Sequence, residues 1–192
     1  MPVVVHTNPS AEPVSLADAK EHLRVVDTAD NAYITSLIAV ARRAIEIQIH
    51  RKLITQTLTL TLNEFPCDRI IHLEFATPLQ SVTHVKYLDV NGDEQTLDPD
   101  SYLVRTQFTP GHIFLKSDQS WPSTYVDGAA VTIQYVVGYG NAGSDVPSDI
   151  VHAIKILVGH YYANRELNVT GTIVAELPRT VDALVMPYKV WS

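Results

Sequence analysis

The hydrophobic period of the sequence changes near residue 53, and this change constrains the fold more than any other feature. Between Asp30 and His50 apolar residues recur every three or four positions, which predicts an amphipathic helix of about five turns. From Ile54 to Leu62 the period is two, with threonine at every second position, which predicts a strand with one buried face. The chain therefore has to combine a helical part with a sheet. The apolar residues of the helix are Ile34, Leu37, Ile38, Ala41, Ile45 and Ile49.

The middle of the chain is predicted to be antiparallel β structure. Strand-like runs follow one another closely here, and Asn91-Gly92 lies between two of them, which is typical of a hairpin with a type I′ turn. Pro110-Gly111 predicts a second turn. The predicted runs are Ile70–Phe75, Val82–Val90, Gln95–Leu97, Tyr102–Arg105, His112–Lys116 and Ala130–Val137.

Helices are predicted on both sides of this β region. Ser15 is typical of a helix N-cap, with Asp18 as its capping-box partner, and Asp30 is expected to cap the long helix. Arg42, Arg43 and Glu46 lie off the apolar stripe of that helix. Another helix is expected from Pro147 to Arg165, where proline suits the first turn, and a short amphipathic segment with Val181, Leu184 and Val185 follows.

These elements predict an α+β fold. We expect a small helical bundle built from the N- and C-terminal helices, with the antiparallel β structure inserted in the middle. The corresponding domains are residues 1–52 together with 138–192, and the inserted subdomain 53–137.

Composition narrows the function. The chain has 192 residues and a formal net charge of −7, which disfavours a protein that grips nucleic acid with a basic face. Its single cysteine excludes an intramolecular disulfide and a cysteine-based zinc site within one chain. No run approaches the roughly 20 apolar residues of a membrane span. The first residues lack a basic region before an apolar stretch, so we expect no signal peptide and a chain that stays in the cytoplasm.

Candidate nucleotide and metal sites have simpler interpretations. The segment Gly138–Gly143 matches G-x-G-x-x-G, but the next helix begins too late and no βαβ unit surrounds it, so we interpret it as a flexible connection. Four histidines, at positions 50, 72, 84 and 112, fall on different predicted elements. His152 and His160 are two helical turns apart, too far to share one ion.

The remaining candidate sites, a thiol, an acidic cluster and a glycosylation sequon, also have simpler interpretations. Cys67 has no positive cluster around it, so we interpret it as an inert loop thiol. Acidic residues near the Asn91-Gly92 turn lack the spacing of a calcium loop and are expected at a solvated hairpin tip. Asn168 heads a glycosylation sequon that we attribute to chance. We therefore expect no catalytic residue, cofactor or metal. The acidic residues are Asp89, Asp93, Glu94, Asp98 and Asp100.

The order of several short motifs along nearly the whole chain is more specific. It resembles the head–tail connector (head-completion adaptor) proteins of tailed bacteriophages, in the branch with a β insertion between the helices. Each motif is weak alone, and the match rests on their order and spacing. The motifs are Val14–Val25, Ala41–Glu46, Thr77–Val82, Val85–Asp89 running into Asn91-Gly92, Trp121-Pro122, Val131–Tyr135 with Gly138-Tyr139-Gly140, Val146-Pro147 and His160–Glu166.

The resemblance implies a structural, non-enzymatic function. Proteins of this family form a ring, usually of twelve subunits, that binds the portal on one side and stopper or tail-side proteins on the other. Genome DNA passes through the lumen without specific binding. The expected location is therefore the head–tail junction of a virion, assembled in the cytoplasm of a bacterial host. Another phage tail-completion protein, or a small nucleotide- or metal-dependent enzyme, are the alternatives.

Four segments are candidates for contacts in such a ring. The helices 30–50 and 147–165 are candidates for packing around the lumen, and the loop Leu167–Glu176 is expected to order on assembly. The tail Pro178–Ser192 is expected either to dock into the portal or a neighbouring subunit, or to pack onto its own domain. The candidate interface residues in this tail are Leu184, Met186, Tyr188, Val190 and Trp191.

Overall fold

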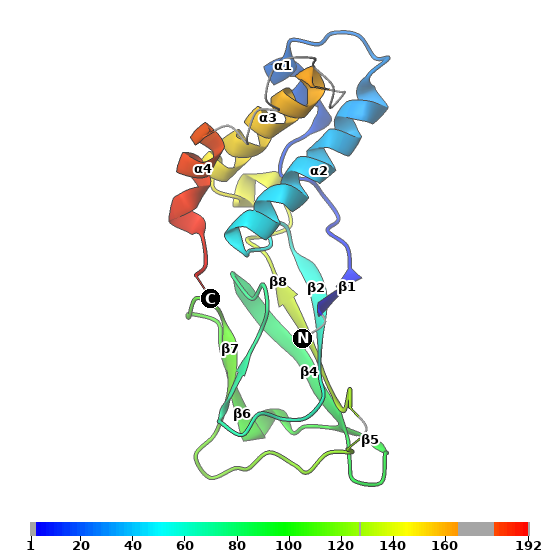
Figure 1. Ribbon diagram of the computed structural model, residues 1–192, viewed down its shortest axis with the longest axis vertical. Helices are drawn as coiled ribbons and strands as arrows, with labels where there is room; N and C mark the ends of the chain where they lie inside the picture. Colours follow the sequence, from blue (N-terminus) through cyan, green and yellow to red (C-terminus); the bar gives the residue numbers. More distant parts are fainter. Residues whose placement is uncertain (1–2, 127, 165–178, 192) are drawn as a thin grey trace, which may run out of the picture. The chain divides into compact units, whose positions relative to one another are not determined.

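The computed structural model describes residues 3–126, 128–164 and 179–191. It contains both α-helices and antiparallel sheets, which confirms the α+β class (Figure 1). Internal contacts divide the chain into two compact units. The β unit comprises strand β1 (Val3–Thr7) and residues Thr55–Tyr139, and the helical unit comprises Ala11–Ile54 and the chain from Gly140 onward. The N-terminal strand thus belongs to the β unit, whereas the domain boundaries predicted from the sequence placed residues 1–52 with the helices.

The helical unit contains four α-helices and two 3₁₀ turns among the described residues. The first helix begins as predicted, because Oγ of Ser15 accepts a hydrogen bond from the backbone N of Asp18 (3.1 Å) and donates one to Oδ2 of Asp18 (2.6 Å). The elements are α1 (Leu16–Leu23), α2 (Asn31–Ile49), η2 (Gly143–Asp145), α3 (Ser148–Ala163), α4 (Arg179–Val185) and η3 (Met186–Tyr188). None of the helices in the described part of the chain is long and apolar enough to cross a membrane.

The start of α2 differs from the prediction. Asp30 occupies the N-cap position, but its side chain makes no capping hydrogen bond there. The carboxylate instead accepts a hydrogen bond from the Tyr162 hydroxyl on α3. A tertiary partner has therefore replaced the local one, and the contact ties the start of α2 to the end of α3.

Helix α2 packs against both α1 and α3, and α3 in turn packs against α4. The predicted stripe of α2 is buried throughout. On α3 the buried residues are Ile150, Ala153, Ile154, Leu157 and Val158, and Tyr161 is partly buried. Both helices therefore present one apolar face to the interior of the helical unit, as amphipathic helices do.

The β unit is built on a five-stranded antiparallel sheet in the order β1-β2-β8-β4-β5. Strand β2 confirms the predicted period of two, because Gln56, Leu58, Leu60 and Leu62 are buried while the threonines between them are half-buried. Besides β1, the strands of this sheet are β2 (Gln56–Leu62), β8 (Val131–Val137), β4 (Leu79–Leu88) and β5 (Glu94–Thr96).

A second, three-stranded antiparallel sheet has the order β3-β7-β6. Side chains from both sheets, among them Leu60, Ile71, Ile113 and Ile133, share one apolar core. The shared core explains why the unit is compact, since each sheet covers the apolar face of the other. These strands are β3 (Ile70–His72), β7 (His112–Leu115) and β6 (Tyr102–Arg105), the last preceded by the 3₁₀ turn η1 (Pro99–Ser101).

The hairpin between β4 and β5 exists, but its predicted turn type is wrong. A type I′ turn requires positive φ at both central residues, and here Gly92 has φ of 88° whereas Asn91 is not among the residues with positive φ. Asp89 organises the turn instead. Its Oδ1 accepts hydrogen bonds from the backbone N of Asn91 (2.8 Å) and of Asp93 (3.2 Å).

Candidate assembly surface

The C-terminal segment, residues 179–191, is attached to the helical unit by contacts with α2 and α3. Near the end of α2, Nε2 of Gln48 donates to Oδ1 of Asp182 (2.6 Å). The backbone N of Val190 donates to the carbonyl of Ile49 (3.0 Å). The Tyr188 hydroxyl donates to Oδ2 of Asp149 at the start of α3 (3.1 Å). The segment is thus held at several points along its length.

Because of these attachments, the five predicted interface residues differ in how exposed they are. Val190 is buried, with 6% of its surface exposed, so it packs within its own unit. Leu184 and Tyr188 are half-buried. Met186 and Trp191 are 57% and 69% exposed. Two large apolar side chains therefore face outward from an otherwise anchored segment, and they are the members of the set that a partner could reach.

Trp191 is oriented by a neighbouring cation. Nζ of Lys189 lies 4.5 Å from the centre of the indole ring, within the range of a cation–π contact. If a partner protein covered Trp191, a large apolar area would be removed from water. Tryptophan residues contribute strongly to protein interfaces for this reason. The Lys189–Trp191 pair therefore combines an apolar face with a positive charge.

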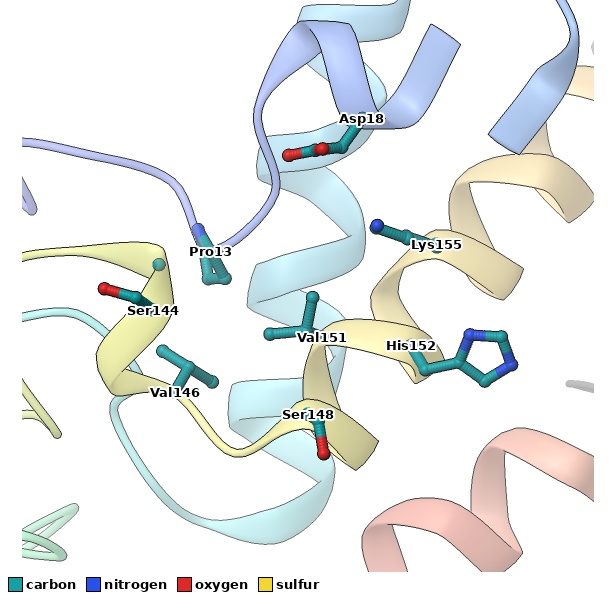
Figure 2. Close-up of a pocket in the computed structure, with 9 residues that line it drawn as sticks. Pro13, Asp18, Ser144, Val146, Ser148, Val151, His152 and Lys155 are labelled. Carbon is teal, nitrogen blue, oxygen red and sulfur yellow. The ribbon is translucent and has the colours of Figure 1, made fainter. Parts of the chain in front are cut away.

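A pocket of about 510 Å³ lies beside the N-terminal half of α3 (Figure 2). Asp18 from α1 and Lys155 from α3 both line it, and Pro13 and Val146 form an apolar part of its wall. Figure 2 shows the ring of His152 turned away from Ser144.

A buried ionic cluster is the main feature that the sequence did not reveal. Arg42 and Glu46 are 7% and 1% exposed, although both were placed off the apolar stripe of α2. Nη1 of Arg42 lies 3.2 Å from Oε2 of Glu46, and Nε of Arg42 lies 2.7 Å from Oε2 of Glu12. Nζ of Lys52 also lies 3.2 Å from Oε2 of Glu46. Burial alone would lower the pKa of Arg42, but hydrogen bonds to Glu12 and the charges of both glutamates outweigh it and raise that pKa.

This cluster joins the chain segments that lead from the helical unit toward the β unit. Glu12 lies just after β1, and Oε1 of Glu46 accepts a hydrogen bond from the backbone N of Leu53 (3.1 Å), just before β2. Ile54 forms a bridge with Gly140, where the chain returns after β8. The helical unit thus secures all three of these segments. The only local signal was the spacing of four between Arg42 and Glu46, and Glu12 and Lys52 are partners that spacing cannot identify.

The segment Gly138–Gly143 is closely packed, which corrects its interpretation as a flexible connection. A Cβ at Gly140 would lie 2.1 Å from Oδ2 of Asp145, and one at Gly143 would lie 2.6 Å from the carbonyl oxygen of Pro13. Oδ2 of Asp145 also accepts a hydrogen bond from the backbone N of Ala142 (2.9 Å). These two glycines are therefore required for close packing of the backbone.

The other candidates do not assemble into a site. His72 and His112 lie opposite each other on β3 and β7, a pairing that the sequence did not reveal, with ring centres 6.3 Å apart. No group of three His, Cys, Asp or Glu side chains suited to a metal occurs in the described residues. Cys67 is exposed. Asp89 uses its carboxylate within the turn, where backbone hydrogen bonds, first that from Asn91, lower its pKa. Asn168 and the loop Leu167–Glu176 lie outside the described residues.

The fold defines a two-unit α+β protein. Its main features are a buried ionic cluster in the helical unit and exposed apolar side chains on the C-terminal segment. The model of the head completion protein family matches residues 13–190, so the chain belongs to this family. Membership confirms the predicted family and its structural role as a head–tail connector of a virion.

The fold is shared with three structures of a gene transfer agent (GTA) particle. Chains in the neck of the empty particle computed with C6 symmetry, the virion of the native particle, and the neck of the native particle computed with C12 symmetry match with TM-scores of 0.83, 0.81 and 0.76. The identities are 22%, 22% and 23%, and each match covers 100% of this chain and 97% of the other. No curated protein matches.

Proposed function

We propose that this chain is a non-catalytic adaptor that forms a ring at the head–tail junction, between the portal and the stopper or tail-side proteins. The observation that carries the proposal is the family match over residues 13–190, which leaves little of the chain for another activity. The similarity to GTA neck chains over the full length supports the same location.

Twelve copies are the proposed size of the ring. The neck structures that share this fold were computed with C6 and C12 symmetry, and both symmetries are compatible with twelve subunits around one axis. In such a ring each subunit contacts its neighbours through two different faces, because the contact is heterologous and closes by rotation. We further propose that the terminal helices form a bundle, with the segment 53–137 as its insertion, and that α2 and α3 pack near the lumen.

The charge distribution supports a channel that does not hold DNA. The β unit contains ten acidic and four basic residues, a net charge of −6, whereas the helical unit contains eleven acidic and ten basic residues, a net charge of −1. Contacts of Lys or Arg with phosphate would bind DNA in a salt-dependent manner, and neither unit has an excess of them. Neutral and acidic walls allow DNA to pass without specific binding.

The C-terminal segment is the proposed contact with the portal. Met186 and Trp191 are exposed on a segment anchored to α2 and α3, so binding would not have to order a free tail. Leu184 and Tyr188 would flank them, and the buried Val190 would hold the segment in place.

Mixing the full chain with the portal protein of the same particle tests this function. We expect rings on the portal in negative-stain images and about thirtyfold weaker binding for Met186→Ala/Trp191→Ala, the loss expected for truncated anchor residues. Val126→Ala, which truncates a valine of the β unit that is 94% exposed, is the matched control. If the chain forms no ring with or without the portal, the proposed function is wrong. If the double variant binds normally, only the assigned contact is wrong.

A further inference from the structure

The two edges of the five-stranded sheet are protected to different degrees. Edge strand β5 is three residues long and carries Glu94, whose Oε1 accepts a hydrogen bond from Nζ of Lys86 (2.7 Å). Edge strand β1 is five residues long and reads Val-Val-Val-His-Thr, without an acidic residue, a lysine, an arginine or a proline. Natural sheets protect free edges with short strands, charges or proline, because an unprotected edge pairs with other strands. Strand β5 has this protection in its length and its charge, whereas β1 has only an irregular register between Val5 and Thr7.

The apolar face of the sheet continues onto β1 and is left partly open there. Val3 packs against the core of the β unit. Val5, which lies on the same face two residues further on, is 39% exposed although its partner on β2, Leu58, is fully buried. Val4 on the opposite face is 62% exposed. Among the described residues β1 pairs with β2 alone. One more strand beside β1 would cover Val5 and complete the core.

The same unit has a second edge that could supply this strand. In the three-stranded sheet β6 pairs only with β7 within the described residues, and its Leu103 is 37% exposed. With four residues β6 is closer to β1 in length than β3 or β5, each of which has three. Figure 1 shows β1 and β6 on opposite sides of the β unit. A contact between them therefore suits neighbouring copies in a ring, which use two different faces.

We propose that β1 is a strand-addition site and that its occupant is the β6 edge of a second copy of this chain. Backbone hydrogen bonds would supply the affinity, and apolar side chains beside Val3 and Val5 would supply the specificity. Repeated around the axis, this contact uses each β1 and each β6 once. The inference deepens the proposed function and rests on it, because it names the contact between subunits of the proposed ring.

Val5→Lys tests the edge. A charge that points inward at a sheet edge blocks strand addition, and Val5 is exposed enough for a single subunit to accept lysine. We expect at least about tenfold weaker association of the copies, measured by native mass spectrometry and negative-stain imaging with portal, because each contact would bury an unpaired charge. Val90→Lys, at a valine of the β unit that is 63% exposed, should leave rings intact. Val5→Thr, which keeps a β-branched side chain, should also form rings.

Cross-linking identifies the occupant. In a Cys67→Ser background, Val4→Cys together with Leu103→Cys should give disulfide-linked multimers under mild oxidation, because both positions are exposed on edge strands. Val4→Cys together with Val126→Cys, which places the second thiol outside β6, should not. Rings that survive Val5→Lys, or rings whose β1 and β6 cysteines do not cross-link, would overturn the inference while leaving the proposed function intact. Absence of rings from the unmodified chain would overturn both.

Discussion

The two units of this protein handle charge in opposite ways. The helical unit is close to neutral and buries part of its charge, since Arg42 and Glu46 lie in its interior. The β unit carries a net charge of −6, yet the buried polar residues in its described part are the uncharged Gln56, Thr77 and Ser101. One unit therefore uses ionic contacts inside, and the other keeps its charge at the surface and relies on an apolar core.

The difference follows from what each unit has to hold together. In the β unit the strand ladders satisfy the backbone, and apolar side chains from two sheets fill the space between them. The helical unit must join segments that are distant in sequence, around Glu12, Leu53 and Gly140, and no ladder spans all of them. The carboxylate of Glu46 accepts from the backbone N of Leu53 and from Arg42, and Arg42 in turn binds Glu12, because a carboxylate accepts several hydrogen bonds at once. The segment at Gly140 is held by its bridge with Ile54.

Glu46→Ala should have the largest effect. It removes a partner of Arg42, of Lys52 and of the backbone N of Leu53, and leaves the buried Arg42 with the carboxylate of Glu12. We expect a loss of about 3–5 kcal/mol in the free energy of unfolding, as for other broken buried ion pairs. Urea denaturation followed by circular dichroism measures it.

Glu21→Ala is the control, because Glu21 is an exposed glutamate on α1 and its loss should change stability by less than about 0.5 kcal/mol. Glu46→Gln, which keeps an acceptor but no charge, should fall between the two. Equal stability of Glu46→Ala and Glu21→Ala would show that the buried cluster does not support the helical unit.

Tyr135→Phe applies a matching change to the β unit. The Tyr135 hydroxyl, on a fully buried side chain, donates to the carbonyl of Glu74 (2.6 Å). Burial, and then the charge of Glu74, raises the pKa of this hydroxyl far above its usual value, so it remains a donor at any working pH. Its removal should cost about 1.5 kcal/mol.

Hydrogen exchange should place that loss in the β unit, with faster exchange in β8 and unchanged exchange in α2. Tyr125→Phe, at a half-exposed tyrosine of the same unit, should have little effect. If Tyr135→Phe accelerated exchange in both units equally, they would not be the separate cooperative bodies that their internal contacts describe.

Local patterns predicted the elements better than their partners. The stripe of α2 and the alternation of β2 were read correctly because each depends on residues a few positions apart. Strand β1 is not among the predicted strands, since three consecutive valines show no alternation and its partner is β2, some fifty residues away. The division of the strands into two sheets was likewise not predictable, because pairing depends on contacts distant in sequence.

The candidate surface was predictable to the same limited degree. Val190 and Trp191 are adjacent apolar residues, and no pattern in a short tail distinguishes the one that packs inward. Val190 is buried because its backbone pairs with Ile49, far away in the sequence. The ionic cluster escaped prediction for the same reason, since polar residues beside an apolar stripe ordinarily face water.

The smallest expected effect compares one carboxylate in each unit. The Ser15 hydroxyl lowers the pKa of Asp18 in the helical unit, and backbone hydrogen bonds lower that of Asp89 in the β unit. Because both folded-state pKa values lie below the unfolded value of about 3.9, each group stabilises the fold above that pH and loses this contribution as the pH falls through its folded pKa.

Ser15→Ala should cost about 1 kcal/mol in the free energy of unfolding through the lost N-cap. It should also raise the pKa of Asp18 toward its usual value in an NMR titration. The pKa of Asp89 should stay low in the same spectra, because the backbone N of Asn91 still donates to it. A parallel rise in both would mean that the hydrogen bonds within the β4–β5 turn do not set the pKa of Asp89 independently of the helical unit.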